Sequence, residues 1–245
     1  MSYETAILVA GAFFGAVVSG SSGFAFGIVS SAVWLHVLPP LRAVPLIVAS
    51  SMILNLAFTL HMRRNISVRE IAPMLLGSIV GVPLGVAVLQ TANAGTLRMG
   101  IGVLLVAYSL ILLFSRKLPT LALAGRQSTM ADGAVGFLSG LLGGATSLNG
   151  VLTAMWVRLR GWSKLKQRAM TQPFVLFTHV LTLSWLGGAG GLDMRTGRDI
   201  LICLPALVTG GWLGLHVFQR LSDRGFNRIV LWLLLVAGVS LLSRS

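Results

Sequence analysis

The sequence predicts an all-α polytopic membrane protein made of two inverted-topology repeats, each with three full spans plus a broken or re-entrant helical hairpin. Three observations lead to this prediction. Of the 245 residues, 55% are hydrophobic and only 10% are charged. The apolar residues gather into long blocks, and two of these blocks are interrupted by Gly and Ser. Short motifs of the first half recur in the second half in the same order.

The low content of charged residues excludes a soluble domain of this length, because such a domain needs a charged surface. The net charge of +13 comes from basic residues in short loops between apolar blocks, where they orient spans rather than bind nucleic acid. Cys203 is the single cysteine, which argues against a disulfide framework or a thiolate metal cluster. Before the first apolar block stands Glu4 and no Lys or Arg, so we do not expect a cleaved signal peptide.

The apolar blocks cover residues 5–38, 42–60, 71–90, 99–114, 131–157, 169–187, 199–218 and 226–242. The first block is too long for one span. A continuous helix over it would be about 51 Å long, against a hydrocarbon core of about 30 Å. Gly20 to Gly23 read GSSG, and Gly and Ser weaken helices. We therefore expect a break there, between two segments of roughly 15 residues each; one long tilted helix is the alternative.

The repeat is read from four matches. Ser19-Gly20 and Gly23 recur as Ser139-Gly140 and Gly143; Arg42-Ala43 recurs as Arg168-Ala169; Gly81 and Gly85 recur as Gly210 and Gly214; and LLVA recurs at 104–107 and 234–237. These matches predict a first repeat at 1–118, a linker at 119–130 and a second repeat at 131–245. The second repeat then has its own interrupted block, which reads GFLSGLLGGATSLNGVLTAMWV at 136–157.

The positions of Lys and Arg test whether the block at 131–157 is broken. If it returns to its own side, the 19 basic residues divide as 14 on one face and 5 on the other; a single crossing divides them as 9 and 10. The positive-inside rule favours the first division. By the repeat, we assign the same break to the first block. Each half then crosses an odd number of times, so the halves are inverted, which is a common plan of secondary transporters.

The same rule gives the sides of the membrane. Met1 and the loops at 91–98 and 188–198 are expected outside the cell. The loops at 61–70, 115–130, 158–168 and 219–228 are expected in the cytoplasm.

Several of these motifs resemble a known family. GSSGFAFG at 20–27, Arg-Ala at the start of the next block, and GFLSGLLGG followed by the basic LRGWSKLKQRA resemble the TauE/SafE family of sulfite and organosulfonate exporters. The resemblance covers essentially the whole chain. It implies a non-enzymatic transporter, in a bacterial plasma (inner) membrane, for a small sulfur-containing anion such as sulfite or sulfoacetate, running outward in the best-known cases.

The two breaks are the candidate substrate site. A broken helix exposes backbone N–H groups and the positive end of a half-helix dipole, so an anion there needs no buried Lys or Arg. The predicted substrate-binding residues at the breaks are Ser21, Ser22, Gly23, Thr146, Ser147 and Asn149. The alternative is that these small residues only allow close helix packing.

Further polar residues fall within the spans. Ser50, Ser51, Asn55, Thr171 and Gln172 are added as substrate-binding candidates. Asn55 is either a site residue or an interhelical hydrogen bond. His179 is a possible proton-coupling group or a hydrogen-bonded structural histidine.

Arg42 and Arg168 each begin a span. They either attract anions to the two mouths of the transport path or extend to the membrane interface.

The sequence also disfavours some functions. Its carboxylates fall at block edges or in loops, which disfavours an ion site that depends on a buried Asp or Glu. It has no Gly-x-Ser-x-Gly motif and no metal-ligand cluster. We expect no cofactor, no metal and no enzyme activity. The expected partners are a small anionic substrate and the lipid bilayer, with no nucleic acid, and the oligomeric state stays open. An anion channel or a membrane scaffold are the alternative functions.

Overall fold

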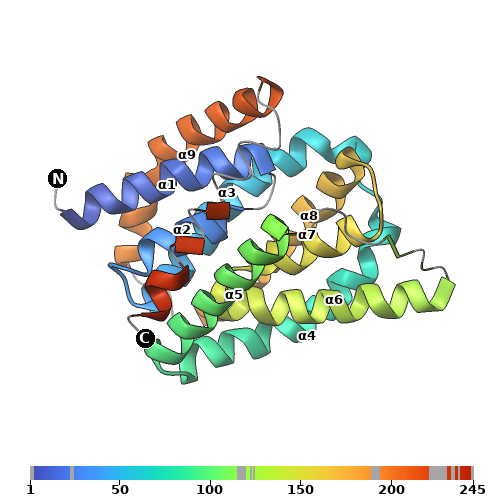
Figure 1. Cartoon of the computed structure of the whole chain (residues 1–245), viewed down its shortest axis with the longest axis horizontal. Coiled ribbons are helices and arrows are strands. Elements are labelled where there is room, and N and C mark those ends of the chain that lie inside the picture. The colour runs from blue at the N-terminus through green and yellow to red at the C-terminus, as the bar shows by residue number, and fades with distance from the viewer. Residues whose placement is uncertain are drawn as a thin grey trace.

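The computed structural model describes residues 3–22, 25–114, 120–121, 123, 125–188, 194–220, 231–232, 235–236 and 238–243. All regular secondary structure in these residues is helical, which confirms the predicted all-α class (Figure 1). The elements are α1 (Tyr3–Ser22), α2 (Phe26–Trp34), α3 (Pro40–Met62), the 3-10 turn η1 (Arg63–Asn65), α4 (Val68–Thr91), α5 (Ala94–Phe114), α6 (Gly125–Thr146), α7 (Asn149–Leu159), α8 (Lys164–Gly188) and α9 (Met194–Arg220).

Both long apolar blocks are broken, as predicted, but the two helices on either side of each break differ in length. The first block divides into α1 with 20 residues and α2 with 9, and the second into α6 with 22 and α7 with 11. The expectation of two segments of equal length was therefore wrong. α1 ends at Ser22, inside GSSG, so the first break begins where it was predicted. Gly20 and Ser21 are still helical, because Gly and Ser lower helix stability by less than about 1 kcal/mol per residue and the packing of α1 on a neighbouring helix outweighs that.

The first hairpin is formed by α2 running back along α1. Trp34 Nε1 donates to the Leu8 carbonyl oxygen at 3.2 Å. Gly15, about two turns further along α1 than Leu8, lies against Phe26 and Ser30. Because the end of α2 lies beside the start of α1, the hairpin returns to the side from which it began.

The second hairpin has the same form. Thr153 Oγ1 donates to Ser139 Oγ at 3.3 Å, and Trp156 Nε1 donates to Asp132 Oδ1 at 2.7 Å. The backbone N–H of Leu121 donates to the Leu159 carbonyl oxygen at 2.6 Å. The described residues before α6 and the end of α7 are therefore at the same end of the molecule, as the charge distribution predicted.

Two parallel helix pairs flank the molecule (Figure 1), and each contains one helix from each half. In the α4–α6 pair, Gly77 lies against Gly133, Gly81 against Phe137 and Gly85 against Leu141. A Cβ atom added to Gly81 would be only 2.1 Å from the Phe137 carbonyl oxygen. Such close contact between backbones is possible only without side chains.

The α1–α9 pair is built in the same way. Gly210 lies against Phe13, and Gly214 lies against Val17 and Gly20. A Cβ atom on Gly214 would be 2.3 Å from the Val17 carbonyl oxygen. Both pairs thus use small residues to bring helices together, as membrane helices commonly do.

Between the flanking pairs, α3 packs on α8. The short helix α2 packs on α3, and the short helix α7 packs on α8. Val44 and Val48, near the start of α3, share an apolar cluster with Leu186, near the end of α8. The two central helices are therefore antiparallel.

Five helices are long and apolar enough to cross a membrane among the described residues: Tyr3–Gly20, Pro40–Leu60, Val68–Thr91, Ala94–Ile111 and Met194–His216. The central helix α8 has 25 residues but a lower apolar content. Its polar residues, among them Gln172, Thr178 and Thr182, are buried by the surrounding helices rather than turned to lipid.

The glycine contacts yield the first testable prediction. Gly81→Val should destabilise the protein by about 1–3 kcal/mol or more, because the added side chain meets backbone that cannot move aside. Thermal unfolding in detergent, together with the monodisperse fraction on size exclusion, measures the effect. Gly100→Val on α5 is the matched control, since nothing lies within 4 Å of its added Cβ. Equal stability of the two variants would contradict the packing described here.

Candidate functional site

The two helix breaks meet. Gly27 is the second residue of α2, and Ser147 lies between α6 and α7. A Cβ atom added to Gly27 would be 2.6 Å from the Ser147 carbonyl oxygen. The start of α2 is therefore in direct contact with the second break, although the two segments come from different halves of the sequence.

The second break contains unusual backbone geometry. Ser147 has a φ angle of 64°, in the left-handed region that residues other than glycine rarely adopt. Its hydroxyl donates to the Thr146 carbonyl oxygen at 2.5 Å, and its backbone N–H donates to the Gly143 carbonyl oxygen at 2.8 Å. Such a conformation costs of the order of 1–3 kcal/mol and tends to cluster at functional sites.

Both short helices begin without a side-chain cap. The N-cap residues are Ala25 for α2 and Leu148 for α7, and the side chain of neither caps its helix. Thr146 Oγ1 instead accepts from the Leu148 N–H at 3.3 Å and donates to the Leu142 carbonyl oxygen at 2.7 Å. Thr146 thus supports the backbone of the second break.

Asn149 ties this break to the centre of α8. Its Nδ2 donates to Thr178 Oγ1 and lies 3.4 Å from His179 Nδ1, while its Oδ1 accepts from the Gly150 N–H at 2.9 Å. Asn149, Thr178 and His179 are all buried. His179 is therefore within hydrogen-bonding distance of a predicted site residue, in an arrangement that serves a structural histidine.

The α3 candidates form a separate group. Asn55 Nδ2 donates to the Ser51 carbonyl oxygen at 2.8 Å and to Ser51 Oγ at 3.0 Å. Asn55 Oδ1 and Ser50 Oγ are buried and have no hydrogen-bond partner among the described residues. These hydrogen bonds stay within α3, and none joins α3 to the second break.

On α8, Thr171 and Gln172 are buried, and Gln172 Oε1 has no hydrogen-bond partner among the described residues. Buried polar atoms of this kind are usually satisfied by protein, water or a ligand. In the first break, Ser21 and Ser22 belong to the last turn of α1. Their side chains, and Gly23 as a whole, lie outside the described residues.

The two arginines differ in their surroundings. Arg42 Nη2 lies 3.3 Å from Asp199 Oδ2 and 3.5 Å from Glu4 Oε1. Arg168 is half-buried, and its Nη2 donates to the Gly20 carbonyl oxygen at 2.7 Å. A cation at the C-terminal end of α1 has a favourable interaction with the helix dipole. The hydrogen bond to Gly20 places Arg168 beside the first break.

Sequence reasoning missed part of this site. Thr178 and Gly27 had not been named as site residues, although Thr178 adjoins His179 and Gly27 is the last residue of GSSGFAFG. Asp132 had been placed at a block edge, but α6 starts at Gly125 and buries Asp132, whose carboxylate accepts from Trp156 Nε1 and lies 3.9 Å from Arg160 Nη1. Among the described residues, no three His, Cys, Asp or Glu side chains are grouped to hold a metal.

The Asn149 contact yields the second testable prediction. Asn149→Ala and Thr178→Val should each lower unfolding stability, and together they should show a coupling energy of about 0.5–3 kcal/mol, because each loses the other's hydrogen bond. A double-mutant cycle on thermal unfolding measures it. The control cycle pairs Asn149→Ala with Thr209→Val, whose hydroxyl bonds only within α9. Additive effects in both cycles would rule out a tie between α7 and α8.

Comparison with known proteins agrees with the resemblance seen in the motifs. No curated protein and no solved structure matches the chain. The family model described as sulfite exporter TauE/SafE matches residues 7–241. The chain, an integral multi-pass membrane protein, therefore belongs to the TauE/SafE sulfite exporter family of membrane transporters.

Proposed function

We propose that this protein exports a small sulfur-containing anion, such as sulfite, sulfoacetate or a related organosulfonate, by alternating access between two inverted halves. The contact between Gly27 and Ser147 is the observation that carries the proposal, because it brings the two helix breaks into one place. The family supplies the transporter class and the sulfur-anion substrates.

The arrangement of the helices supports the inverted repeat. In the repeat read from the sequence, α1 corresponds to α6, α3 to α8, and α4 to α9. The contact of α1 with α9 then has its counterpart in the contact of α6 with α4, and α3 with α9 has its counterpart in α8 with α4. The antiparallel α3–α8 contact is its own counterpart. These matched contacts are the ones that a two-fold axis in the membrane plane would produce.

The chemistry of the breaks supports an anion as substrate. The first turns of α2 and α7 carry N–H groups and the positive ends of two helix dipoles, and neither N-cap residue caps its helix with a side chain. In α7 the Gly150 N–H is already bonded to Asn149 Oδ1. Thr146 and Ser147 add hydroxyl groups, whose protons turn to the substrate from the Leu142 and Thr146 carbonyl oxygens that accept them without substrate. A sulfonate offers three acceptor oxygens to such donors. The same proposal includes the other predicted substrate-binding residues, which are Ser21, Ser22 and Gly23 at the first break, Ser50, Ser51 and Asn55 on α3, and Thr171 and Gln172 on α8. Arg168 lies beside the first break, and His179 lies beside Asn149.

The driving force follows from charge. A membrane potential that is negative inside favours outward movement of an anion by about 2.3 kcal/mol per charge per 100 mV. Asp132, the buried carboxylate of α6, already has Trp156 and Arg160 as partners. We therefore propose export that follows the potential without a sodium gradient.

The third testable prediction concerns the flux of anions through the purified protein. Purified protein in liposomes should transport sulfite or an organosulfonate but not a carboxylate of similar size, and collapsing the membrane potential should slow export. Preloaded substrate should accelerate the uptake of labelled substrate, because a carrier exchanges and a channel does not. No flux with any sulfur oxyanion would reject the proposal, and a strict sodium requirement would reject its energetics.

Within the same assay, Ser147→Ala tests the site. Losing one donor should weaken substrate affinity about five- to 150-fold, equivalent to about 1–3 kcal/mol. Ser109→Ala, at a buried hydroxyl on α5, is the control and should bind normally.

The fourth testable prediction is topological. We propose that the N-terminus and the loops at 91–98 and 188–198 face outward from a bacterial plasma membrane, and that 61–70, 115–130, 158–168 and 219–228 face the cytoplasm. Single cysteines introduced into a Cys203→Ser background should react with an impermeant reagent from the corresponding side only. Labelling of 61–70 and 91–98 from the same side would contradict this orientation.

A further inference from the structure

Two ion pairs join equivalent helices at opposite ends of the molecule. At one end, Lys166 Nζ lies 2.9 Å from Glu70 Oε2 and joins α8 to α4. At the other end, Arg42 joins α3 to α9 through Asp199. Because α3 and α8 are antiparallel and each cation is near the start of its helix, the two pairs cannot be at the same end.

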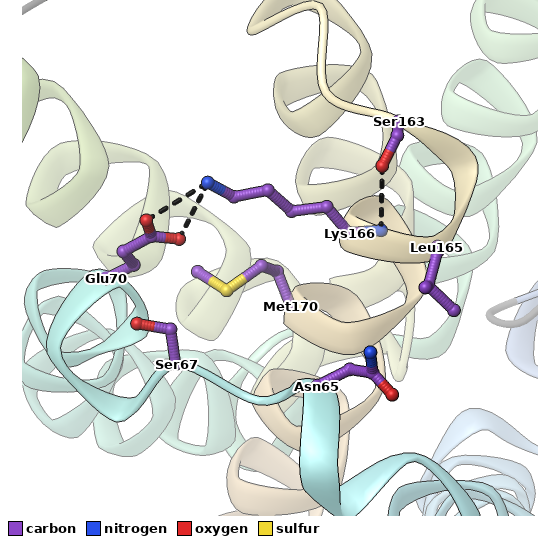
Figure 2. A pocket seen from close by; sticks show the side chains of 7 residues that line it. All are labelled: Asn65, Ser67, Glu70, Ser163, Leu165, Lys166 and Met170. Carbon is purple, nitrogen blue, oxygen red and sulfur yellow. Dashed lines mark hydrogen bonds and ion pairs between the residues drawn. The ribbon is translucent and has the colours of Figure 1, made fainter.

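A cavity of about 280 Å³ lies at the Lys166–Glu70 ion pair. It is lined by Asn65, Ser67, Glu70, Ser163, Leu165, Lys166 and Met170. Figure 2 shows the Lys166 side chain reaching from α8 toward α4 to meet Glu70, with the Met170 side chain between the two helices. Lys166 is therefore the cation of a polar cavity whose carboxylate is supplied by the opposite helix.

A row of side chains on α8 leads from this cavity to the candidate site. Lys166, Met170, Phe174 and Thr178 are spaced four residues apart, so each lies about one turn beyond the last and about 40° further round the helix, and the row extends over about 18 Å. Thr178 is the residue that accepts from Asn149. Met170 and Phe174 are buried, in an apolar cluster with Met74 of α4. The cavity thus lies at one end of this row of side chains, and the second break lies at the other end. The buried apolar side chains of Met170 and Phe174 close the path between them.

The ion pair is easily broken. The side chains of Lys166 and Glu70 are 40% and 43% exposed, and pairs so exposed contribute little to stability. Lys166 Nζ also lies 4.7 Å from the centre of the Trp162 ring. This cation–π contact keeps the ammonium group near the cavity when its ion pair with Glu70 is broken. The amide of Asn65 and the hydroxyl of Ser67 are further donors on the cavity wall.

We propose that this cavity is the entry site for the transported anion, and that Lys166 exchanges the Glu70 carboxylate for an anionic group of the substrate. Loss of the ion pair removes one of the contacts between α4 and α8, beside their apolar cluster, and loosens the entrance at Met170. This proposal rests on the proposed export of a small anion. Glu70 acts as a built-in competitor, so its removal both frees Lys166 and loosens the entrance.

Cysteine labelling tests the opening and is the fifth testable prediction. Met170→Cys is made in a Cys203→Ser background, and its reaction with N-ethylmaleimide is compared with its reaction with a bulky polyethylene-glycol maleimide in detergent. Both reagents sense thiol reactivity, but only the bulky one senses the width of the entrance. Glu70→Gln should raise the ratio of bulky to small reagent rates up to about fivefold, the most that an exposed pair of this kind contributes.

Asp199→Asn is the matched control, because it removes the same charge from the equivalent ion pair at the opposite end, and it should not raise the ratio. The double variant Glu70→Lys with Lys166→Glu should restore the original ratio. Ser67→Cys, a nearly isosteric change on the cavity wall, is the second reporter position if Met170→Cys does not fold. An equal ratio in Glu70→Gln and Asp199→Asn would overturn the proposed entrance.

Methanesulfonate tests the anion site. At equal ionic strength, methanesulfonate should slow the labelling of Met170→Cys more than sodium gluconate does. This protection should be stronger in Glu70→Gln than with Glu70 present. It should be absent in Lys166→Gln. Protection that is independent of Lys166, or no protection, would overturn the site. These outcomes are separate from the flux assay: flux without protection rejects this inference alone, and protection without flux rejects the proposed export alone.

Discussion

Direct contact between helix backbones positions nearly every other feature of this molecule. Gly77, Gly81 and Gly85 are spaced one turn apart on α4, and each lies against the backbone of α6. In a bilayer, apolar side chains gain little by leaving lipid for protein, so close packing and backbone proximity must hold helices together. Because α6 leads directly into the second break, the glycines of α4 determine where Thr146 and Ser147 are held.

The opposite flank follows the same rule with the roles of the halves exchanged. Gly210 and Gly214 of α9 hold α1, and the end of α1 holds the carbonyl that binds Arg168. Gly20 and Gly143, which belong to the repeated motifs beside the two breaks, serve packing, because added Cβ atoms there would meet α9 and Asn149. The two flanking helix pairs therefore hold the polar residues of the centre, such as Asn149, Thr178 and His179, against each other.

The first break was expected from the length of the block at 5–38, and the second from the division of Lys and Arg between the two faces. The helices end inside the predicted stretches, at Ser22 and Thr146. The unequal lengths of the two helices in each hairpin did not follow, because helix packing rather than local propensity determines where the short helices end. Among the candidate residues, Asn149 and His179 come together because they face each other across α7 and α8. Thr178 lacked any signal except its place beside His179, and the burial of Asp132 depended on Trp156, a partner that no periodicity reveals.

The pairing of helices from different halves has a consequence for how the chain is completed during synthesis. The α4–α6 contact joins segments that are near in sequence, so it forms soon after α6 leaves the ribosome. The contact of Phe13 with Gly210 must wait for the segments between them, roughly 10–40 s at about 5–20 residues per second. During that interval the Trp34 indole, bonded to Leu8, keeps α2 on α1. The first helix made thus receives one of its neighbours only after most of the chain has been synthesised, and nascent chains that stop before α9 leave Phe13, Val17 and Gly20 of α1 without that neighbour.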